Sequence, residues 1–252
     1  MEHYYSEHQE SLLKIKKITQ KIRGVDFEFY ASSGVFSKSR IDKGTLILAE
    51  NIILDKNSKV LDMGCGIGVL GIVAAKLFNV DVVMSDTNKR AVMLTEKNID
   101  LNDVKAMIYQ GNLFEPIKQN DFDVILSNPP QTAGKQLCFK LIEQSKSHLR
   151  DNGSLQLVAR HNKGGRMLRN KMQEVFGNVK VIAKKSGYWV YISKKSTHIT
   201  KKGNSRLRQT FHMLALIHIN YKTEFSKYCF KLKERGKHPK KCLVAVARKL
   251  AV

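Results

Sequence analysis

The stretch K-V-L-D-M-G-C-G-I-G-V-L-G, residues 59–71, decides the fold of this chain. A short apolar run ends in the acid Asp62, glycines follow at positions 64, 66 and 68, and an apolar helical pattern starts at Val69. This order predicts a buried strand, a tight glycine turn and a helix. Because glycine has no Cβ and tolerates positive φ, the backbone amides of such a turn can approach a ligand closely.

A second acid, Asp86, follows the next apolar run at residues 80–84. Two parallel strands would then each end in a carboxylate at one edge of the sheet, where a ligand with a ribose can bind. The glycines at 66, 68 and 71 also satisfy the dinucleotide pattern G-x-G-x-x-G, so a dinucleotide and a ligand-free turn are the alternatives. The carboxylate of Asp62 would repel a pyrophosphate but attract the ammonium and sulfonium groups of S-adenosylmethionine, which the pattern therefore favours.

A further strand is predicted at residues 122–127, and it runs directly into Asn128, Pro129 and Pro130. The prolines cannot continue a helix or a central strand, and they lack an amide hydrogen. The carbonyl groups of this turn therefore stay uncommitted, and the side-chain oxygen of Asn128 adds an acceptor beside them. Two acceptors at the mouth of the sheet can hold a planar amine and aim its lone pair at an electrophilic methyl group. An ordinary turn is the alternative.

Residues 34–195 resemble the small-domain methyltransferase family of class I S-adenosylmethionine-dependent enzymes, whose characterised bacterial members modify the exocyclic amine of guanine in ribosomal RNA. The resemblance rests on GVFSKSRIDKGT at 34–45, VLDMGCGIGVLG at 60–71, Ser85 with Asp86, GNLF at 111–114 and SNPP at 127–130. It implies an α/β fold, with a Rossmann-like, seven-stranded, mostly parallel sheet that ends in an antiparallel hairpin. It also implies S-adenosylmethionine as the cofactor and RNA as the partner.

In that family the matching positions imply that the loop at 64–68 cradles the methionine part, that Asp86 binds the ribose hydroxyls and that position 112 faces the adenine. The resulting cofactor-binding residues are Asp62, Gly64, Cys65, Gly66, Gly68, Asp86, Thr87, Asn112, Leu113 and Asn128. Asn128 and Pro129 are the predicted catalytic residues that grip the amine, with Pro130 and Gln131 next to the substrate. Two positions depart from the pattern: Asn112 stands where an aspartate is usual, and Gln131 where many relatives carry a base-stacking aromatic.

Several basic residues fall on loops at the expected substrate edge: Lys135, Arg160, Lys163 and Arg166. Contact with phosphates is the functional interpretation, and a solvated basic surface is the alternative. The neighbouring His161 is not expected to act as a base, because an amine acceptor sheds its proton after methyl transfer.

The pattern divides the chain into an N-terminal helix and hairpin arm (1–33), a methyltransferase domain (34–195) and a basic helical extension (196–252). Helical spacing of apolar residues predicts a helix within residues 1–23, which packs on the core or, because lysines surround it, serves as a basic arm on RNA. Alternation predicts a strand at 25–30 that pairs with a strand near Val35. In the central domain we expect strands at 59–63, 81–85, 105–110, 122–127, 154–160, 178–184 and 187–193, and helices at 46–54, 68–78, 88–101, 134–149 and 164–176. Alternating strands and helices give a sheet covered on both faces.

The net charge of +22 indicates a polyanionic partner. Residues 1–195 carry 30 basic and 20 acidic side chains, whereas residues 196–252 carry 14 and 2. No apolar run reaches membrane-spanning length, so we expect a cytoplasmic protein with no membrane partner. The four scattered cysteines predict reduced thiols, and neither they nor the histidines form a metal-binding pattern.

Residues 196–203 are polar and predict a linker, followed by three helices that start near residue 204 or 205, near 221 and at Pro239. The strings ITKKGNSRLRQTFHMLALIHIN and RGKHPKKCLVAVARKL resemble the C-terminal end of the transposases of one group of insertion sequences. The ribonuclease-like catalytic domain of those transposases is absent from this sequence, so the resemblance implies a fused fragment. Its basic helices are expected to bind nucleic acid, DNA included, or to remain on the surface.

Three functional hypotheses follow. The first is methyl transfer from S-adenosylmethionine to a guanine, or an adenine, in RNA. The second is methylation of another planar amine, such as a DNA adenine or a protein glutamine amide. The third is a non-catalytic nucleic-acid-binding protein.

Overall fold

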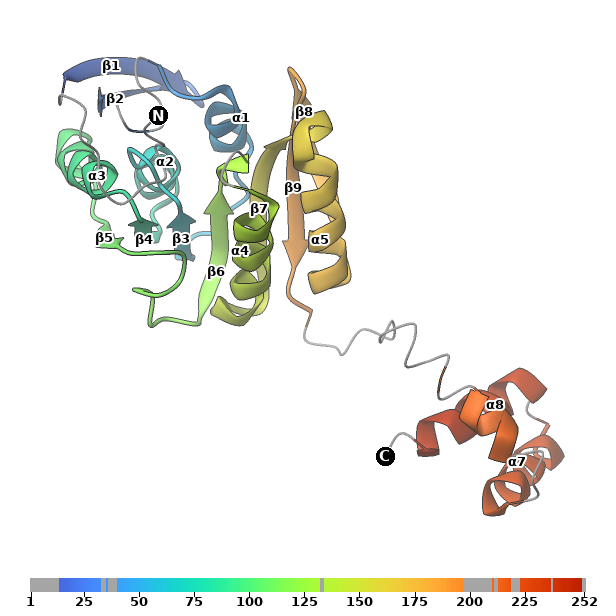
Figure 1. Cartoon of the computed structure of the whole chain (residues 1–252). Coiled ribbons are helices and arrows are strands. Elements are labelled where there is room, and N and C mark those ends of the chain that lie inside the picture. The colour runs from blue at the N-terminus through green and yellow to red at the C-terminus, as the bar shows by residue number, and fades with distance from the viewer. Residues whose placement is uncertain are drawn as a thin grey trace. The chain divides into compact units, whose positions relative to one another are not determined.

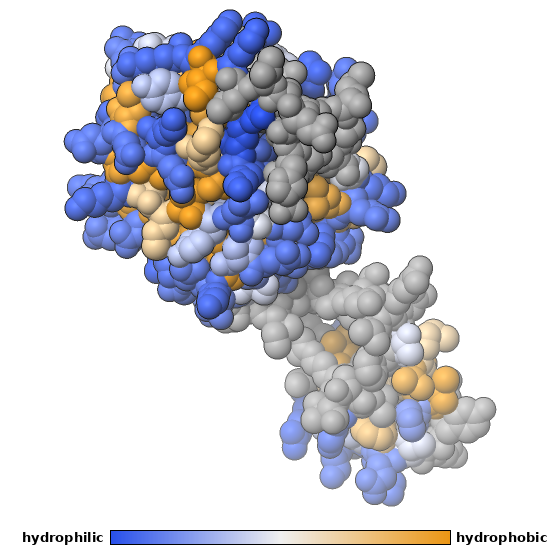
Figure 2. Space-filling model, turned by 60° about the vertical axis from the view of Figure 1, so that its left-hand side comes forward, coloured by the Kyte–Doolittle hydropathy of each residue, from blue (hydrophilic) through white to orange (hydrophobic). Residues whose placement is uncertain are grey.

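In the computed structural model the chain forms two units, Met1–Thr197 and His198–Val252 (Figure 1). It describes residues 14–32, 35, 40–131, 134–196, 210, 213–218, 223–236 and 238–250. Among these residues, no helix is both long and apolar enough to cross a membrane. On the face of the molecule in Figure 2, hydrophilic side chains predominate and apolar ones form smaller patches between them.

The first unit is built on a seven-stranded sheet of order β5-β4-β3-β6-β7-β9-β8. Strand β9 runs antiparallel to both of its neighbours, and the other pairs are parallel, which confirms the predicted Rossmann-like sheet with a terminal hairpin. The strands are β3 (Lys59–Met63), β4 (Asp81–Asp86), β5 (Met107–Gln110), β6 (Phe122–Ser127), β7 (Leu149–Arg160), β8 (Lys180–Lys185) and β9 (Tyr188–Lys194). The helices are α1 (Lys43–Asn51), α2 (Val69–Phe78), α3 (Lys89–Leu101), α4 (Lys135–His148) and α5 (Arg166–Phe176), with a short π-helical turn, η2 (His161–Gly165), before α5.

Helices cover both faces of the sheet, and the alternation of side chains along the strands divides the core accordingly. Val60 of β3 packs in a cluster with apolar side chains of α1, α2 and α3. Its neighbour Leu61 packs in a second cluster with side chains of α4 and α5. Because all parallel strands end at the same edge, their carboxyl ends bring the loops after β3, β4, β6 and β7 together.

The N-terminal part of the unit differs from the expectation. Residues 15–22 form a strand, β1 (Ile15–Ile22), instead of a helix, and pair antiparallel with β2 (Val25–Ser32). The predicted partner strand near Val35 lies largely outside the described residues, and the observed partner of β2 is β1. A two-residue turn, Arg23 and Gly24, joins the strands, and both residues have positive φ (52° and 81°), as the favoured hairpin turn requires. Apolar residues at 15, 18 and 22 fit a helix in isolation, but the pairing with β2 decides the structure.

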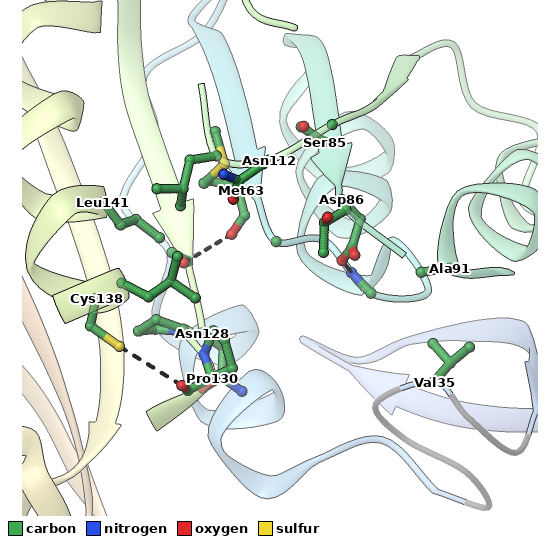
Figure 3. Close-up of a pocket in the computed structure, with 18 residues that line it drawn as sticks. Val35, Met63, Ser85, Asp86, Ala91, Asn112, Asn128, Pro130, Cys138 and Leu141 are labelled. Carbon is green, nitrogen blue, oxygen red and sulfur yellow. Dashed lines mark hydrogen bonds between the residues drawn. The ribbon is translucent and has the colours of Figure 1, made fainter. Parts of the chain in front are cut away.

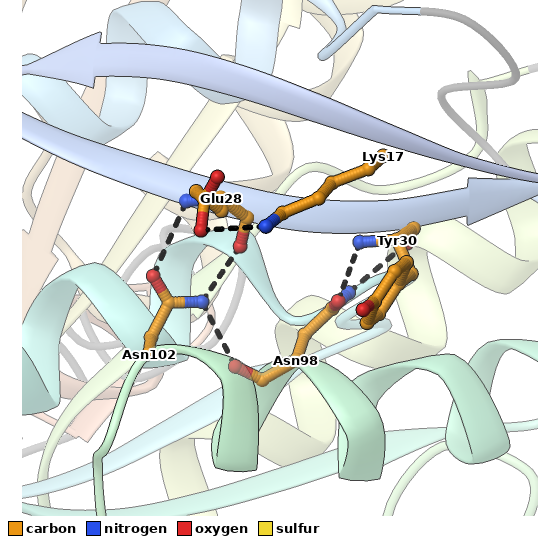
Figure 4. Close-up of polar contacts among 5 residues, drawn as sticks. All are labelled: Lys17, Glu28, Tyr30, Asn98 and Asn102. Atoms are coloured by element: carbon orange, nitrogen blue, oxygen red, sulfur yellow. Dashed lines mark hydrogen bonds and ion pairs between the residues drawn. The ribbon is translucent and has the colours of Figure 1, made fainter.

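Strand β2 is attached to α3 by two asparagines one helical turn apart (Figure 4). Asn98 accepts from the Tyr30 amide at 2.6 Å and donates to the Tyr30 carbonyl at 3.1 Å, and Asn102 makes the same pair of bonds with Glu28 at 3.3 and 2.7 Å. Four residues of helix rise about 6 Å and two residues of strand about 6.7 Å, so the two side chains match two successive outward-facing peptide groups.

The second unit is a small helical bundle. Helices α7 (Glu224–Glu234) and α8 (Pro239–Leu250) and the helical residues 213–218 enclose a core of five side chains: Ala215, Cys229, Leu232, Cys242 and Val246. The predicted helices near 221 and at Pro239 are present. The predicted start of the first helix at 204 or 205 lies outside the described residues, and the resemblance to transposases stays a prediction. All four cysteines of the chain are buried thiols that take part in no disulfide.

Candidate functional site

The glycine turn after β3 is fastened to the end of β4. The amides of Gly64 and Cys65 both donate to the carbonyl of Ser85, at 2.8 and 3.0 Å. Gly64 and Gly66 have positive φ (71° and 59°), and a Cβ at either position would meet nothing within 4 Å. The turn therefore presents bare backbone toward an open space, which a side chain at these positions would fill.

Helix α3 supports the turn from behind. Thr95 Oγ1 donates to the Gly66 carbonyl at 2.9 Å, and Asn98 Nδ2 donates to the Ile67 carbonyl at 2.9 Å. A Cβ at Gly68 would lie 2.8 Å from Thr95 Cγ2, so only glycine allows this approach of turn and helix. Gly68 thus shapes the turn and does not line the cavity.

The two predicted acids lie on either side of the turn. Asp86 Oδ2 accepts from the Gly66 amide at 2.8 Å and Oδ1 from the Asn88 amide at 2.9 Å. Asp62 Oδ2 accepts from the Gly71 amide at 2.9 Å, while its buried Oδ1 has no hydrogen-bond partner among the described residues. Burial is the main cause that raises the pKa of Asp62 to about 7 and that of Asp86 to about 6.

Asn128, directly after β6, is held by the start of α1. Its Nδ2 donates to Asp42 Oδ2 at 3.0 Å and to Thr45 Oγ1 at 2.9 Å. Asp42 is also the N-cap of α1, because Oδ2 accepts from the amides of Gly44 and Thr45. Because both hydrogens of Asn128 Nδ2 are donated to these two acceptors, the side-chain amide has one orientation. Its Oδ1 remains available as an acceptor.

A pocket at the carboxyl edge of the sheet joins these parts (Figure 3). Of the predicted cofactor and amine-binding residues, eight line it: Gly64, Gly66, Asp86, Thr87, Asn112, Leu113, Asn128 and Pro129; Pro130 lines it as well. A smaller adjoining pocket is lined by Asp62 and Cys65, and it shares Gly64, Gly66 and Asn128 with the first. Nearly all of the predicted set therefore surrounds one space.

The other predicted substrate residues lie outside the pocket lining. Gln131 bonds to the next loop, with Nε2 donating to the Lys163 carbonyl at 2.9 Å and Oε1 accepting from the Arg160 amide at 3.0 Å. The side chains of Lys135, Arg160 and Arg166 are exposed.

Sequence reasoning missed several residues of the site. Asp42 and Thr45 are the most important, and an acid directly before a helix is a recognisable N-cap signal that could have identified the first. The apolar walls of the pocket include Met63, Ala91, Cys138 and Leu141, for which the hydrophobic pattern gives no functional signal. Among the described residues, no group of three or more potential metal ligands is present.

Comparison with known proteins gives a consistent result. The profile of the family described as "Methyltransferase small domain" matches residues 26–192. An uncharacterised protein, YbxB of Bacillus subtilis, is 35% identical over 198 residues, which cover 77% of this chain and 98% of YbxB. Ribosomal RNA small subunit methyltransferase C of Haemophilus influenzae is 33% identical over 171 residues, 66% of this chain and 51% of that protein.

Among solved structures, the 16S rRNA N2 G1207 methyltransferase of T. Thermophilus, determined with AdoMet and guanosine, has a TM-score of 0.65. It is 23% identical, and the match covers 75% of this chain and 52% of that one. A methyltransferase from Pyrococcus furiosus gives a TM-score of 0.52 at 25% identity, covering 57% and 78% of the two chains. This chain thus spans about half the length of the named ribosomal RNA methyltransferases.

Proposed function

Because this chain belongs to the methyltransferase small domain family, we propose that it transfers a methyl group from S-adenosylmethionine to the exocyclic amine of a guanine in ribosomal RNA. The methyltransferase class and its cofactor follow from the family. The nucleobase and the ribosomal RNA are the proposal, and they are supported by the relative from Haemophilus influenzae, which matches over about half its length. On this proposal the enzyme works in the cytoplasm, where ribosomes are made.

The residues around the pocket fit S-adenosylmethionine. The open side of Gly64 and Gly66 leaves room for the methionine part against bare backbone. Two buried side-chain oxygens, Asp62 Oδ1 and Ser85 Oγ, have no partner among the described residues, and each belongs to a residue that lines one of the two pockets. A cation beside Asp62 and ribose hydroxyls beside Asp86 would compensate the burial of these carboxylates.

The single observation that carries the amine-transfer proposal is the fixed orientation of Asn128. Its nitrogen is committed to Asp42 and Thr45, so its oxygen is the acceptor offered to the pocket. An exocyclic amine that donates to this oxygen and to a carbonyl of the proline turn is held with its lone pair directed away from both.

When bound, S-adenosylmethionine supplies a methyl group on a positively charged sulfur. Transfer of this methyl group, with its sulfur–carbon bond breaking as the nitrogen–carbon bond forms, would develop positive charge on the amine nitrogen. The oxygen of Asn128, polarised by the carboxylate of Asp42 behind it, stabilises that charge without moving. The amine then releases a proton, which water can accept, so no strong protein base is needed.

Methyl transfer from radiolabelled S-adenosylmethionine to total RNA, DNA and protein tests the proposal, with Asn128→Ala as the matched control. Label in ribosomal RNA, on the N2 position of guanine after digestion, is the expected result. Label confined to DNA adenine or to protein glutamine would show that the proposed substrate is wrong but that the proposed methyl transfer is right. If the protein binds RNA but no fraction becomes labelled, only the hypothesis of a non-catalytic nucleic-acid-binding protein would remain.

A further inference from the structure

The loops beside the amine site form one connected surface. Gln131, next to the proline turn, bonds to the backbone of both Arg160 and Lys163. The amide of His161 in turn donates to the carbonyl of Gly187, in the turn between β8 and β9, at 2.9 Å. The end of β7, η2 and the β8–β9 turn are therefore tied to the mouth of the pocket by hydrogen bonds.

This surface and the adjoining first turn of α5 include the exposed basic side chains of Arg160, Lys163, Arg166, Arg169 and Lys184. None of the five forms an ion pair with a carboxylate among the described residues. Among the described residues, ion pairs with carboxylates are formed by Lys17, Lys59, Arg150 and Lys171, and most other cations, Lys180 and Lys194 included, have none. The five are distinguished by their position beside the amine site. Like charges gathered without neutralisation are unfavourable for the folded protein alone, and they create a strongly positive potential beside the site.

An aromatic stack holds two of these cations, Lys184 and Arg166. The ring of His161 lies flat on Trp189, with centroids 3.5 Å apart and planes at 7°, and Lys184 Nζ lies 4.1 Å from the Trp189 ring centroid. Arg166 Nε donates to His161 Nε2 at 3.2 Å, so Nδ1 carries the proton and faces Tyr191 Oη at 2.7 Å. The stack therefore orders a lysine from β8 and an arginine from the start of α5.

The charges facing His161 agree with this arrangement. Burial and then the cations Arg166, Arg169 and Lys184 hold the pKa of His161 below its ordinary value, and Tyr191 Oη is its neutral neighbour on β9. The imidazole is consequently neutral at pH 7 and acts as an acceptor and a stacking partner for the cationic groups around it.

We propose that this surface, the cation platform (Arg160, Lys163, Arg166, Arg169 and Lys184 around the His161–Trp189 stack), binds the phosphates of the RNA strand that flanks the methylated nucleotide. The inference rests on the proposed function and goes beyond it, because it assigns contacts to Arg169, Lys184 and the β8–β9 hairpin. A nucleotide inserted at Asn128 must leave its neighbours at the pocket mouth, and Gln131 joins that mouth to the platform. Arginines and lysines without carboxylate partners are suited to phosphate contacts.

The test compares two double variants of the full chain with equal loss of charge. Arg169→Gln with Lys184→Gln removes two platform cations, whereas Lys180→Gln with Lys194→Gln removes two exposed lysines from the opposite end of the same hairpin. Binding of a fluorescein-labelled single-stranded RNA of mixed sequence is measured across a salt series. In the platform variant, the plot of log affinity against log salt should become less steep by about 0.7 for each lost contact. In the control variant its steepness should change little.

Two further readouts separate the possible outcomes. Trp189 is the only tryptophan of the chain, so its emission should change when RNA binds to the wild type. Unchanged affinity for S-adenosylmethionine would show that the platform variant is folded. If wild-type protein methylates RNA but the platform variant keeps the wild-type salt slope, the platform is wrong and the proposed function stands. If the wild type labels no RNA yet the platform variant loses RNA affinity, the proposed function fails, and the platform stands only as an RNA-binding surface.

Discussion

Asn128 and Asp42 lie 86 positions apart in sequence, and the side-chain nitrogen of one donates to the carboxylate of the other at 3.0 Å. The same carboxylate oxygen caps α1, so the helix start and the amide orientation depend on one atom.

The substitution Asn128→Ala should lower kcat on the order of 10²-fold, because it removes an acceptor that stabilises charge in the transition state. Affinity for S-adenosylmethionine, measured by calorimetry, should change little. Asn120→Ala, the same chemical change at an exposed position before β6, serves as the control. Unaltered turnover in Asn128→Ala would remove this residue from the mechanism.

Thr45 is expected to be a positioning residue, since its hydroxyl accepts one of the two hydrogen bonds that fix the Asn128 amide. Thr45→Val keeps the shape and should lower kcat up to about 10-fold, as expected for one hydrogen bond, with KM for RNA nearly constant. Thr45→Ser retains the hydroxyl and should restore turnover. Equal losses in the valine and serine variants would indicate a packing role instead.

The raised pKa values of Asp62 and Asp86, about 7 and about 6 against 3.8 in ordinary surroundings, predict two pH effects. The ligand-free folded state holds more protons than the unfolded state between about pH 4 and 7, so these groups contribute stability at low pH that is lost as pH rises through this window. Cofactor affinity should change in the opposite sense and increase from pH 5 to 8, because ionised Asp62 attracts the cationic group and ionised Asp86 is the stronger acceptor for the ribose hydroxyls. Calorimetry in buffers of different ionisation enthalpy should detect proton release on binding.

Affinity that is constant over this pH range, or that falls as pH rises, would contradict the assignment of the two acids to the cofactor. Thermal unfolding of ligand-free protein over the same pH range provides the control, because it reports the pH dependence of stability without that of cofactor binding.

Removal of residues 198–252 should leave a folded unit that binds S-adenosylmethionine, since the glycine turn, Asp86 and Asn128 all belong to the unit Met1–Thr197. RNA affinity at low salt should fall and its salt dependence should become flatter, because residues 196–252 carry 14 basic and only 2 acidic side chains. Single-turnover methyl transfer at saturating RNA should be nearly unchanged. Loss of transfer under those conditions would mean that the extension contributes to the active site.

The parts of the fold that could be predicted are those with short-range signals. The predicted bounds of β3 and β6 equal the observed Lys59–Met63 and Phe122–Ser127, because each strand is apolar and ends at glycines or prolines. The helix predicted over residues 15–22 is wrong, because the spacing of isoleucines 15, 18 and 22 suits both a helix and a strand. The pairing with β2 selects the strand, and the local sequence does not show that pairing. The hydrogen bonds of Asn128 join it to residues 86 and 83 positions away in the sequence. No local sequence pattern predicts contacts between residues so far apart along the chain.

The asparagine pairs on α3 have a consequence for the solubility of the protein. An unpaired strand edge is a template for the addition of a strand from another molecule, and β2 would offer such an edge on the side away from β1. Asn98 and Asn102 occupy two of its peptide groups with both a donor and an acceptor each, which aspartate or leucine could not do. The side chains of Glu28 and Tyr30 take no part in these bonds. Two of the peptide groups that this edge would offer to another strand are therefore already paired, whichever side chains stand at positions 28 and 30.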